Sequence, residues 1–426
     1  MIPIEKLNDG NATYIAVASD IHYRTDDNGE SEAKLRHAFE TLNKLAPLDG
    51  FIFAGDMTNN GFEEEYNGFM KAVRDIIPDS TKVVTCMGNH EWYRHGWGVN
   101  IQKNPGFTEM YHELFEKCTG NAIENDIVCG GIHMIVVSSD DETDRISTRE
   151  PYLTEHIRAA AEEDPSKPIF VAMHKAVKYT VISSYNPRTR DTAFLSQDFS
   201  DEFLNFLKNY PQVVFVSGHT HVSLRYPTSI HQKDYTSIQL GTMGGVPSTG
   251  FIFSISSDNI VKAYRINFTD GYIYDEPWVI DIPAAVKDKS SFRYTDARAD
   301  ALTPPEFEGE FKVTALDCDK IEFTHPIVRD PDPTGDANSY AYIIRLYDVT
   351  NGKYIDVFDD DPEDCELPID CYAYVIDVDR PRKTSRPVVF DSLTPDTDYR
   401  IELGTLSVYN DETEPIYFEF KTKKQA

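Results

Sequence analysis

Five short hydrophobic runs in the first part of the chain, each leading into a motif with Asp or His, constrain the fold more than any other feature. The runs are residues 14–18, 51–54, 82–86, 169–172 and 213–216. The motifs that follow them are Ser19-Asp20-Ile21-His22, Gly55-Asp56, Gly88-Asn89-His90-Glu91, Met173-His174 and Gly218-His219-Thr220-His221. Short runs of this kind predict buried strands, so we expect all five motifs to lie at the carboxyl ends of strands.

Helical patterns separate these runs. Apolar residues recur at helical spacing from Glu30 to Leu45, and Pro47 is a stop signal. Further helices are expected at about 63–76, 108–117, 152–163 and 199–209. The alternation of strand and helix predicts a layered α/β sheet with the helices outside. Ligands of such sheets bind beyond the carboxyl ends of the strands, so the five motifs are predicted to form one site.

The ordered set of motifs resembles that of the calcineurin-like metallophosphoesterases over about residues 12–280. The resemblance implies a four-layer αββα sandwich that hydrolyses phosphate esters with two divalent metal ions. One ion would be held by Asp20, His22, Asp56 and His221. The other would be held by Asp56, Asn89, His174 and His219, so that Asp56 bridges the two.

The chemistry of these side chains agrees with such a centre. Imidazole and carboxylate ligands without thiolate suit manganese, iron, zinc or nickel, and oxygen-only calcium is disfavoured. A lone histidine is more often structural than a ligand, but five of the twelve histidines (22, 90, 174, 219 and 221) fall in the motifs. Two ions roughly 3.5–4 Å apart lower the pKa of a shared water and clamp an in-line displacement at phosphorus. The expected nucleophile is therefore a bridging hydroxide.

His90 is the expected acid catalyst, because it lies next to a ligand position and has no metal role in the family. Glu91 is expected to support the loop. The chain departs from two subfamilies: His22 and Asn59 stand where purple acid phosphatases carry Gly and Tyr, so an iron tyrosinate is not expected. Protein phosphatases carry an Asp at the place of Asn59 that orients the catalytic histidine. Without it, His90 is either a weaker acid or supported by another residue.

The fragment from Gly55 to Gly61 looks most like bacterial phosphodiesterases that act on cyclic nucleotides or related small esters. We therefore expect a small-molecule phosphate ester as substrate, with phosphodiesters slightly preferred over monoesters. The alternative is a non-catalytic binding or adhesion module that retains a structural metal site.

The chain changes character after the motifs. Residues 284–305 read as a linker, and beyond them short strand candidates recur while the helical signal disappears, which is typical of a β-sandwich. The turn Leu393 to Tyr399 resembles that of fibronectin type III domains, in which the Tyr makes a corner hydrogen bond. The predicted domains are a metallophosphoesterase domain at 1–285, a linker at 286–302 and a fibronectin type III-like all-β sandwich at 303–426. A protein partner of this last domain cannot be named from the sequence.

Composition excludes some partners. The formal net charge is -30, which argues against binding a nucleic-acid duplex. No uninterrupted run of about 18 apolar residues exists, so no membrane span is expected. The first residues lack the apolar core of a signal peptide, which slightly favours the cytoplasm. Free thiols are favoured for the cysteines, although loop disulfides Cys365–Cys371 and Cys118–Cys129 stay open.

Several further features have two interpretations. Those near the expected site are three aromatic residues after the central motif, a partly basic segment at 175–196, and His95. The aromatic residues are Trp92, Tyr93 and Trp97, and the basic ones are Lys175, Lys178, Arg188 and Arg190. The aromatic residues either line the pocket or are packing anchors. The basic segment is either a substrate-facing loop or, as we slightly favour, a solvated surface insertion. His95 is a surface or core residue unless it reaches the substrate. The acidic run 359–364 either binds calcium or, as we favour, is a solvated loop.

Overall fold

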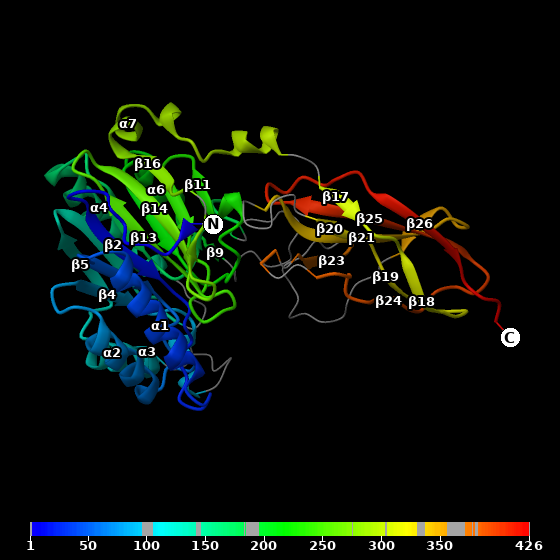
Figure 1. The fold of residues 1–426 in the computed structure, drawn as a ribbon, viewed down its shortest axis with the longest axis horizontal. Helices are drawn as coiled ribbons and strands as arrows, with labels where there is room; N and C mark the ends of the chain where they lie inside the picture. The colour runs from blue at the N-terminus through cyan, green and yellow to red at the C-terminus, as the bar shows by residue number, and fades with distance from the viewer. Residues whose placement is uncertain are drawn as a thin grey trace. The chain divides into compact units, whose positions relative to one another are not determined.

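The computed structural model describes residues 2–95, 105–141, 146–182, 184, 196–274, 276–302, 305–329, 337–355, 371–376, 378–379 and 382–425. The chain divides into two compact units (Figure 1). Unit 1 comprises Met1–Tyr185, Ala193–Leu224 and Ser229–Thr295, and unit 2 comprises Asn186–Thr192, Arg225–Thr228 and Asp296–Ala426. The main division falls inside the segment 286–302, and the domain limits given above stay predictions.

Unit 1 contains an eight-stranded sheet in the order β1-β15-β14-β13-β2-β3-β4, with β16 also paired to β14. Its strands are β1 (Ile2–Pro3), β2 (Thr13–Ala18), β3 (Gly50–Ala54), β4 (Lys82–Cys86), β13 (Thr249–Ile255), β14 (Ile260–Asn267), β15 (Tyr272–Ile273) and β16 (Trp278–Asp281). β2, β3 and β4 are parallel, so their carboxyl ends lie at one edge of the sheet.

A six-stranded sheet in the order β11-β12-β10-β7-β6-β5 forms the second half of unit 1. Its strands are β5 (Glu124–Cys129), β6 (Ile132–Val137), β7 (Ile169–Ala172), β10 (Val213–Ser217), β11 (Ile230–Gln232) and β12 (Thr236–Gln239). β7 and β10 are parallel neighbours. Two short strands, β8 (Ala176–Val177) and β9 (Ser196–Gln197), pair separately.

Alternating side chains build four layers. Along β2, Ala16 and Ala18 pack in a core with the helices, whereas Ile15 and Val17 pack in a second core against the six-stranded sheet. Helices α1 (Glu30–Leu45), α2 (Glu63–Ile76) and α3 (Pro105–Thr119) cover the first sheet, and α4 (Glu150–Glu163) and α6 (Asp201–Leu207) pack on the other face of the second. Since successive strand residues point to opposite faces, fully apolar strands fit between layers. The predicted αββα sandwich is confirmed.

Two local predictions needed correction. The apolar pattern of residues 272–280 predicts one strand, but the structure has two short ones. Ile273 pairs with Ile266 whereas Trp278 pairs with Ala263, and Pro277 between them has no N–H to donate. The hairpin strand β5 was not predicted. A short helix, α7 (Ile282–Lys287), follows β16. No helix among the described residues is both long and apolar enough to cross a membrane.

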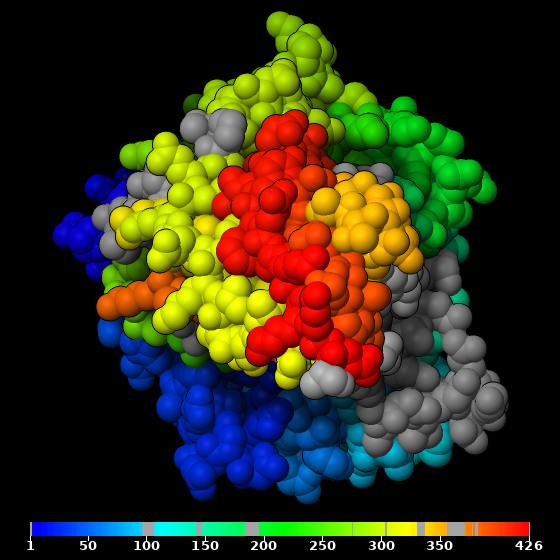
Figure 2. Space-filling model, turned by 90° about the vertical axis from the view of Figure 1, so that its right-hand side faces the viewer, coloured from blue at the N-terminus to red at the C-terminus, as the bar shows by residue number. Residues whose placement is uncertain are grey.

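In the part of unit 2 that the structure describes, the elements are β-strands, apart from a 3-10 helix at Asp296–Ala301 and the first residues of another at Pro227–Ser229. One sheet has the order β22-β21-β25-β26 with β23 on β21, another has the order β18-β19-β24, and β17 pairs with β20. The strands are β17 (Glu306–Glu308), β18 (Lys312–Leu316), β19 (Ile321–Thr324), β20 (Ile327–Arg329), β21 (Ser339–Asp348), β22 (Lys353–Ile355), β23 (Tyr372–Val375), β24 (Val388–Phe390), β25 (Asp398–Ser407) and β26 (Ile416–Lys421). In Figure 2 the red end of the chain, which includes β26, lies open on the face shown.

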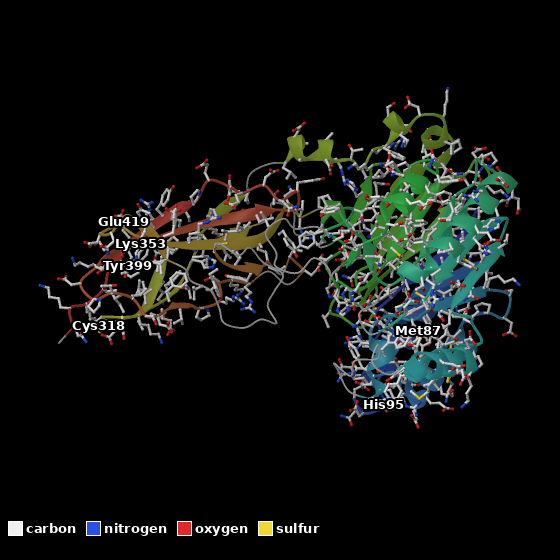
Figure 3. All side chains as sticks on the ribbon, turned by 180° about the vertical axis from the view of Figure 1, so that it is seen from behind. Met87, His95, Cys318, Lys353, Tyr399 and Glu419 are labelled. Carbon is white, nitrogen blue, oxygen red and sulfur yellow. The ribbon has the colours of Figure 1, made fainter. Side chains whose placement is uncertain are left out.

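The corner hydrogen bond expected in unit 2 is present. The Thr394 backbone N–H donates to the Tyr399 hydroxyl at 2.9 Å, and Tyr399 is buried within the sandwich (Figure 3). Cys118 and Cys129 have free thiols, as the favoured interpretation held. Cys365 and the acidic run 359–364 lie outside the described residues.

Candidate metal centre

The five motifs lie where the strands end, as predicted. Asp20 and His22 follow β2, Asp56 follows β3, and His90 follows β4. His174 follows β7 of the other sheet. The remaining motif residues, His219 and His221, follow β10. Strands from both sheets therefore deliver polar side chains to one place, although these residues are far apart in sequence.

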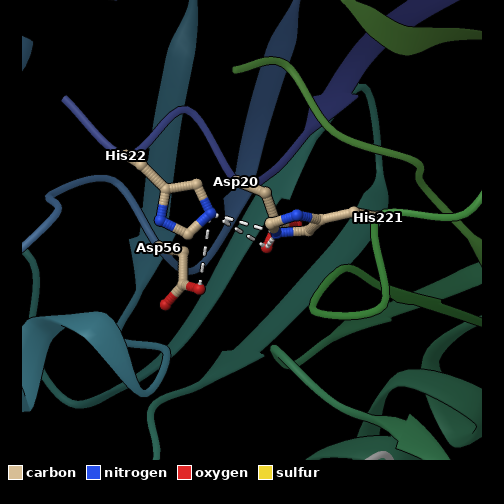
Figure 4. A group of neighbouring side chains, drawn as sticks. All are labelled: Asp20, His22, Asp56 and His221. Atoms are coloured by element: carbon tan, nitrogen blue, oxygen red, sulfur yellow. Dashed lines mark hydrogen bonds and ion pairs between the residues drawn. The ribbon is translucent and has the colours of Figure 1, made fainter. Parts of the chain in front are cut away.

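The first group of candidate ligands is Asp20, His22, Asp56 and His221, whose ligand atoms all lie within 4.8 Å of one another (Figure 4). His22 Nε2 is 3.0 Å from His221 Nε2 and 3.9 Å from both Asp20 Oδ1 and Asp56 Oδ2. His221 Nε2 is 2.9 Å from Asp20 Oδ1. Two imidazole nitrogens and two carboxylates that face one another in this way fit a divalent cation between them.

The second group is Asp56, His174 and His219, again within 4.8 Å. His174 Nε2 is 3.1 Å from Asp56 Oδ2, and its Nδ1 lies 2.9 Å from the Ala54 carbonyl oxygen. That contact fixes the ring so that Nε2 points into the site. Asn89 joins this group, because its Oδ1 is 3.0 Å from His219 Nδ1.

Five of the candidate ligands have a left-handed backbone. The φ angle is 58° at Asp20, 49° at His22, 52° at Asp56, 70° at His219 and 52° at His221. Such a conformation costs a non-glycine residue roughly 1–3 kcal/mol and persists where the surrounding structure imposes it, commonly at ligand sites. The sharp turns after these strands are therefore part of how the site is built.

Two glycines allow the carboxylates to approach the backbone closely. A Cβ at Gly88 would lie 2.4 Å from Asp56 Oδ1, and a Cβ at Gly218 would lie 2.2 Å from Asp20 Oδ2. Either contact is far inside van der Waals distance, so the sequence needs glycine at both positions.

The protonation states of the group suit metal binding. Burial by itself raises the pKa of Asp56, but the imidazoles around it, His174 first, hold that pKa well below its ordinary value. Burial also opposes ionisation of Asp20, whose pKa is nevertheless lowered by His221. Burial lowers the pKa of His22 to about 4. Ionised carboxylates and a neutral imidazole are the forms that bind a divalent cation.

Comparison with known proteins agrees with this geometry. Residues 13–223 match the family described as calcineurin-like phosphoesterase. This part of the chain belongs to that family. Among curated proteins none matches the chain.

Solved structures give distant likenesses. The purple acid phosphatase PPD1 from yellow lupin (Lupinus luteus) seeds has 12% identity and a TM-score of 0.45, covering 66% of this chain and 55% of that one. PhoD has 10% identity and a TM-score of 0.41, covering 66% and 69%. The fibronectin type III domain of human collagen alpha-1(XX) has 14% identity and a TM-score of 0.18, covering 29% and 90%. The family assignment rests on the family match and not on these likenesses.

In this calcineurin-like domain, His90 begins the 3-10 helix η1 (His90–His95) directly beside the candidate ligands. Its backbone N–H donates to Asp56 Oδ1 at 2.9 Å, and its ring lies 4.3 Å from that of His22. Its Nδ1 is 2.8 Å from the Asn59 carbonyl oxygen. The backbone of Asn59, and not its side chain, therefore orients His90 and leaves Nε2 available.

Glu91 holds the motif loops together, which confirms the role expected for it. One carboxylate oxygen accepts from the N–H groups of Asp56 at 2.9 Å and Gly88 at 2.7 Å. The other accepts from the Thr58 N–H at 2.8 Å and the Thr58 hydroxyl at 2.9 Å. Burial and the Asp56 carboxylate raise the pKa of Glu91 to about 8, whereas four donors aimed at its oxygens favour the ionised carboxylate.

Neither of the two described aromatic residues after the central motif belongs to the lining of the pocket beside the site. Trp92 is a packing anchor: it is buried and its Nε1 donates to Ser139 Oγ at 2.8 Å. The hydroxyl of Tyr93 accepts from Asn89 Nδ2 at 2.5 Å, which leaves Asn89 Oδ1 turned to the second group. Trp97 lies outside the described residues.

Three of the remaining candidates, His95, Lys175 and Lys178, fall within the described residues. His95 packs against α3, where it contacts the Tyr111 hydroxyl at 2.8 Å and stacks on Phe107 (Figure 3). Lys175 is buried, and Lys178 pairs with Asp198 at 3.1 Å. Arg188 and Arg190 lie outside the described residues.

A pocket of about 470 Å³ opens beside the first group of ligands. Its lining includes the rings of His22, His90 and His221, together with Arg24 and Lys34. The sequence does not single out either cation. Arg24 precedes α1 and Lys34 lies near its start, and neither belongs to a recognisable motif. A charged residue two positions after Asp20-x-His22 was the only available signal.

Proposed function

We propose that this chain hydrolyses phosphate esters with two divalent metal ions, and that phosphodiesters are slightly preferred over monoesters. The observation that carries the proposal is the position of Asp56, which belongs to both groups of candidate ligands. Its Oδ2 lies 3.1 Å from His174 Nε2 and 3.9 Å from His22 Nε2. A shared carboxylate between two sets of imidazoles is the arrangement that a two-ion site requires.

The geometry supports an assignment of residues to the two ions. Asp20, His22, Asp56 and His221 would hold one, and Asp56, Asn89, His174 and His219 the other. The donor set fits manganese, iron, zinc or nickel. Bound ions of this kind supply an activated water and stabilise the charge on the phosphoryl oxygens.

His90 supplies the proton for the leaving group in this proposal. Its Nδ1 contacts the Asn59 carbonyl oxygen, so the ring is held with Nε2 available for the ester oxygen that leaves. The carbonyl dipole stabilises the protonated ring less than a carboxylate would. We therefore expect His90 to be a useful acid, most important for substrates whose leaving group is a poor one.

Activity assays test the proposal directly. Purified full-length protein loaded with manganese should hydrolyse bis-p-nitrophenyl phosphate and p-nitrophenyl phosphate. His90→Ala should lose at least about 100-fold in rate while retaining its metal, since acid catalysis contributes roughly 10²–10⁴-fold. His95→Ala is the matched control, because His95 packs on α3 and belongs to neither group of candidate ligands. Metal-loaded protein that is silent on a broad panel of esters would refute the proposal.

A panel of phosphate esters also distinguishes nucleotide from non-nucleotide substrates. No aromatic side chain other than histidine contributes to the described lining of the pocket. The described lining thus offers no ring of Phe, Tyr or Trp for stacking on a base. Cyclic nucleotides should consequently be compared with non-nucleotide diesters. The alternative function, a binding module with a structural metal site, predicts bound metal without turnover of any ester.

A further inference from the structure

Arg24 is an unneutralised cation at the edge of the pocket. Its side chain is exposed, and its Nη2 donates to Asn59 Oδ1 at 2.9 Å. Among the described residues no carboxylate forms an ion pair with it. Other arginines contrast with this: Arg36 pairs with Glu32 at 2.8 Å and with Asp75 at 2.7 Å. In a chain with a net charge of -30, an arginine held without a carboxylate points to an anion from outside the protein.

Asn59 explains why the charge of Arg24 stays available. The backbone oxygen of Asn59 contacts His90 Nδ1 at 2.8 Å, while its side-chain oxygen accepts from Arg24. The side chain of residue 59 therefore serves Arg24 and not His90. An amide orients the guanidinium without neutralising it, whereas an Asp in this place would form an ion pair with Arg24.

The other charged groups of the pocket are engaged within the protein. Lys34 Nζ donates to the Gly244 carbonyl oxygen at 2.9 Å and lies 3.1 Å from Glu30. Asp27 accepts from the N–H groups of Gly29 at 3.0 Å and Ser31 at 2.8 Å, at the start of α1. Within the described lining, Arg24 is the cation left for a ligand.

We propose that Arg24 binds an anionic phosphoryl oxygen of the substrate, and that Asn59 is the positioning residue that presents it. This inference rests on the proposed function of the same site. After Nη2 bonds Asn59, the guanidinium retains further N–H donors in a planar fork, the geometry that matches phosphate oxygens. The loop after β2 thus supplies a cation. The loop after β3 orients both this cation and His90, which follows β4, around one substrate group.

The first experiment compares Arg24→Gln with wild type and with Arg74→Gln, an exposed arginine on α2 outside the pocket. On manganese-loaded full-length protein we expect KM for p-nitrophenyl phosphate to rise roughly 10- to 100-fold, with kcat changed less than about threefold. Arg24→Lys should recover part of the loss. Calorimetry with inorganic phosphate should show the same order of affinities. Unchanged KM and phosphate affinity in Arg24→Gln would overturn the inference.

A second variant separates the two roles open to residue 59. If Asn59 presents Arg24, Asn59→Asp should weaken phosphate binding about as much as Arg24→Gln, because the new carboxylate neutralises the guanidinium. If residue 59 acts through His90, the same variant should keep or raise kcat with no change in phosphate affinity, and the inference is then wrong. Wild-type protein without activity would refute the proposed function but not the role of Arg24. Phosphate binding by wild type and by the Arg24 variants still tests that role.

Discussion

The two units treat their buried polar groups in opposite ways. At the candidate metal centre of unit 1, carboxylates and imidazoles face one another, with His22 Nε2 only 3.0 Å from His221 Nε2, on a strained backbone. In unit 2, the Tyr399 hydroxyl accepts one backbone N–H, and His325 Nε2 lies 2.6 Å from the Tyr374 hydroxyl. The first arrangement is costly without a ligand, whereas the second stabilises the fold by itself. Changes in unit 1 should therefore affect function more than stability, and changes in unit 2 the reverse.

The largest effect should come from Asp56→Asn. Removing the carboxylate shared by both groups should weaken binding of both ions and lower activity about a thousand-fold. The reason is that the ions lower the free energy of the charged transition state by several kcal/mol. In chelator, the melting temperature should stay equal or rise, since the buried Asp20 no longer faces a second negative charge. Activity assays and thermal melts with and without chelator test both parts. A large loss of stability in chelator would erase the contrast between the units.

Glu91→Gln should be the exception within unit 1. Glu91 is buried and accepts from four donors, so an amide nitrogen in place of one oxygen would face an N–H group. We expect a loss of roughly 2–4 kcal/mol in the free energy of unfolding. Urea unfolding measures it, with the exposed Glu64→Gln as control. A nearly neutral result would mean that Glu91 is protonated, as its raised pKa allows.

The pH dependence of unit 2 should report His325. Burial lowers the pKa of His325 to about 4 from an ordinary 6.5. Between these values the unfolded chain binds a proton that the folded unit does not. The contribution of neutral His325 to the free energy of unfolding is therefore fully present above about pH 6.5 and is lost as the pH falls toward 4. From pH 7 to pH 5 the loss should be roughly 2 kcal/mol.

Amide exchange of β21 and β25 in a urea series at both pH values measures this loss. Comparison with His325→Gln isolates the histidine from the many carboxylates of the unit. Equal slopes in the two proteins would show that His325 does not contribute.

Tyr399→Phe should have the smallest effect. The Thr394 N–H would lose its acceptor, which costs about 1 kcal/mol. The variant should unfold at a lower urea concentration in the β25 region, with unchanged phosphoesterase activity. If activity falls while the unit stays folded, the functional separation of the two units is wrong.

The sequence predicts the parts of this structure that depend on local patterns. Buried strands such as β2 and β10 are continuous apolar runs. Parallel pairing then brings Asp20 and Asp56 to one edge of the first sheet, and His174 and His221 to one edge of the second. The Tyr399 corner is likewise a local motif. These features need only periodicity and turn chemistry.

The features that the sequence does not predict depend on tertiary contacts. The sequence leaves open what supports His90. In the structure the backbone of Asn59 does so, and its side chain turns to Arg24. Whether His90 contacts the backbone oxygen or the side-chain oxygen of Asn59 depends on the geometry of the loop after β3, which no pattern of residues encodes. The break between β15 and β16 was missed for a similar reason, since the two strands pair with different parts of β14.

Metal stoichiometry tests the central claim most directly. Full-length protein dialysed against manganese and passed through a desalting column should contain two ions per chain by elemental analysis, and Asp56→Asn should retain at most one. This result would establish that distant loops of unit 1 form a two-ion site around Asp56. Wild-type protein that retains no metal, or an Asp56→Asn variant that keeps both ions, would contradict the account.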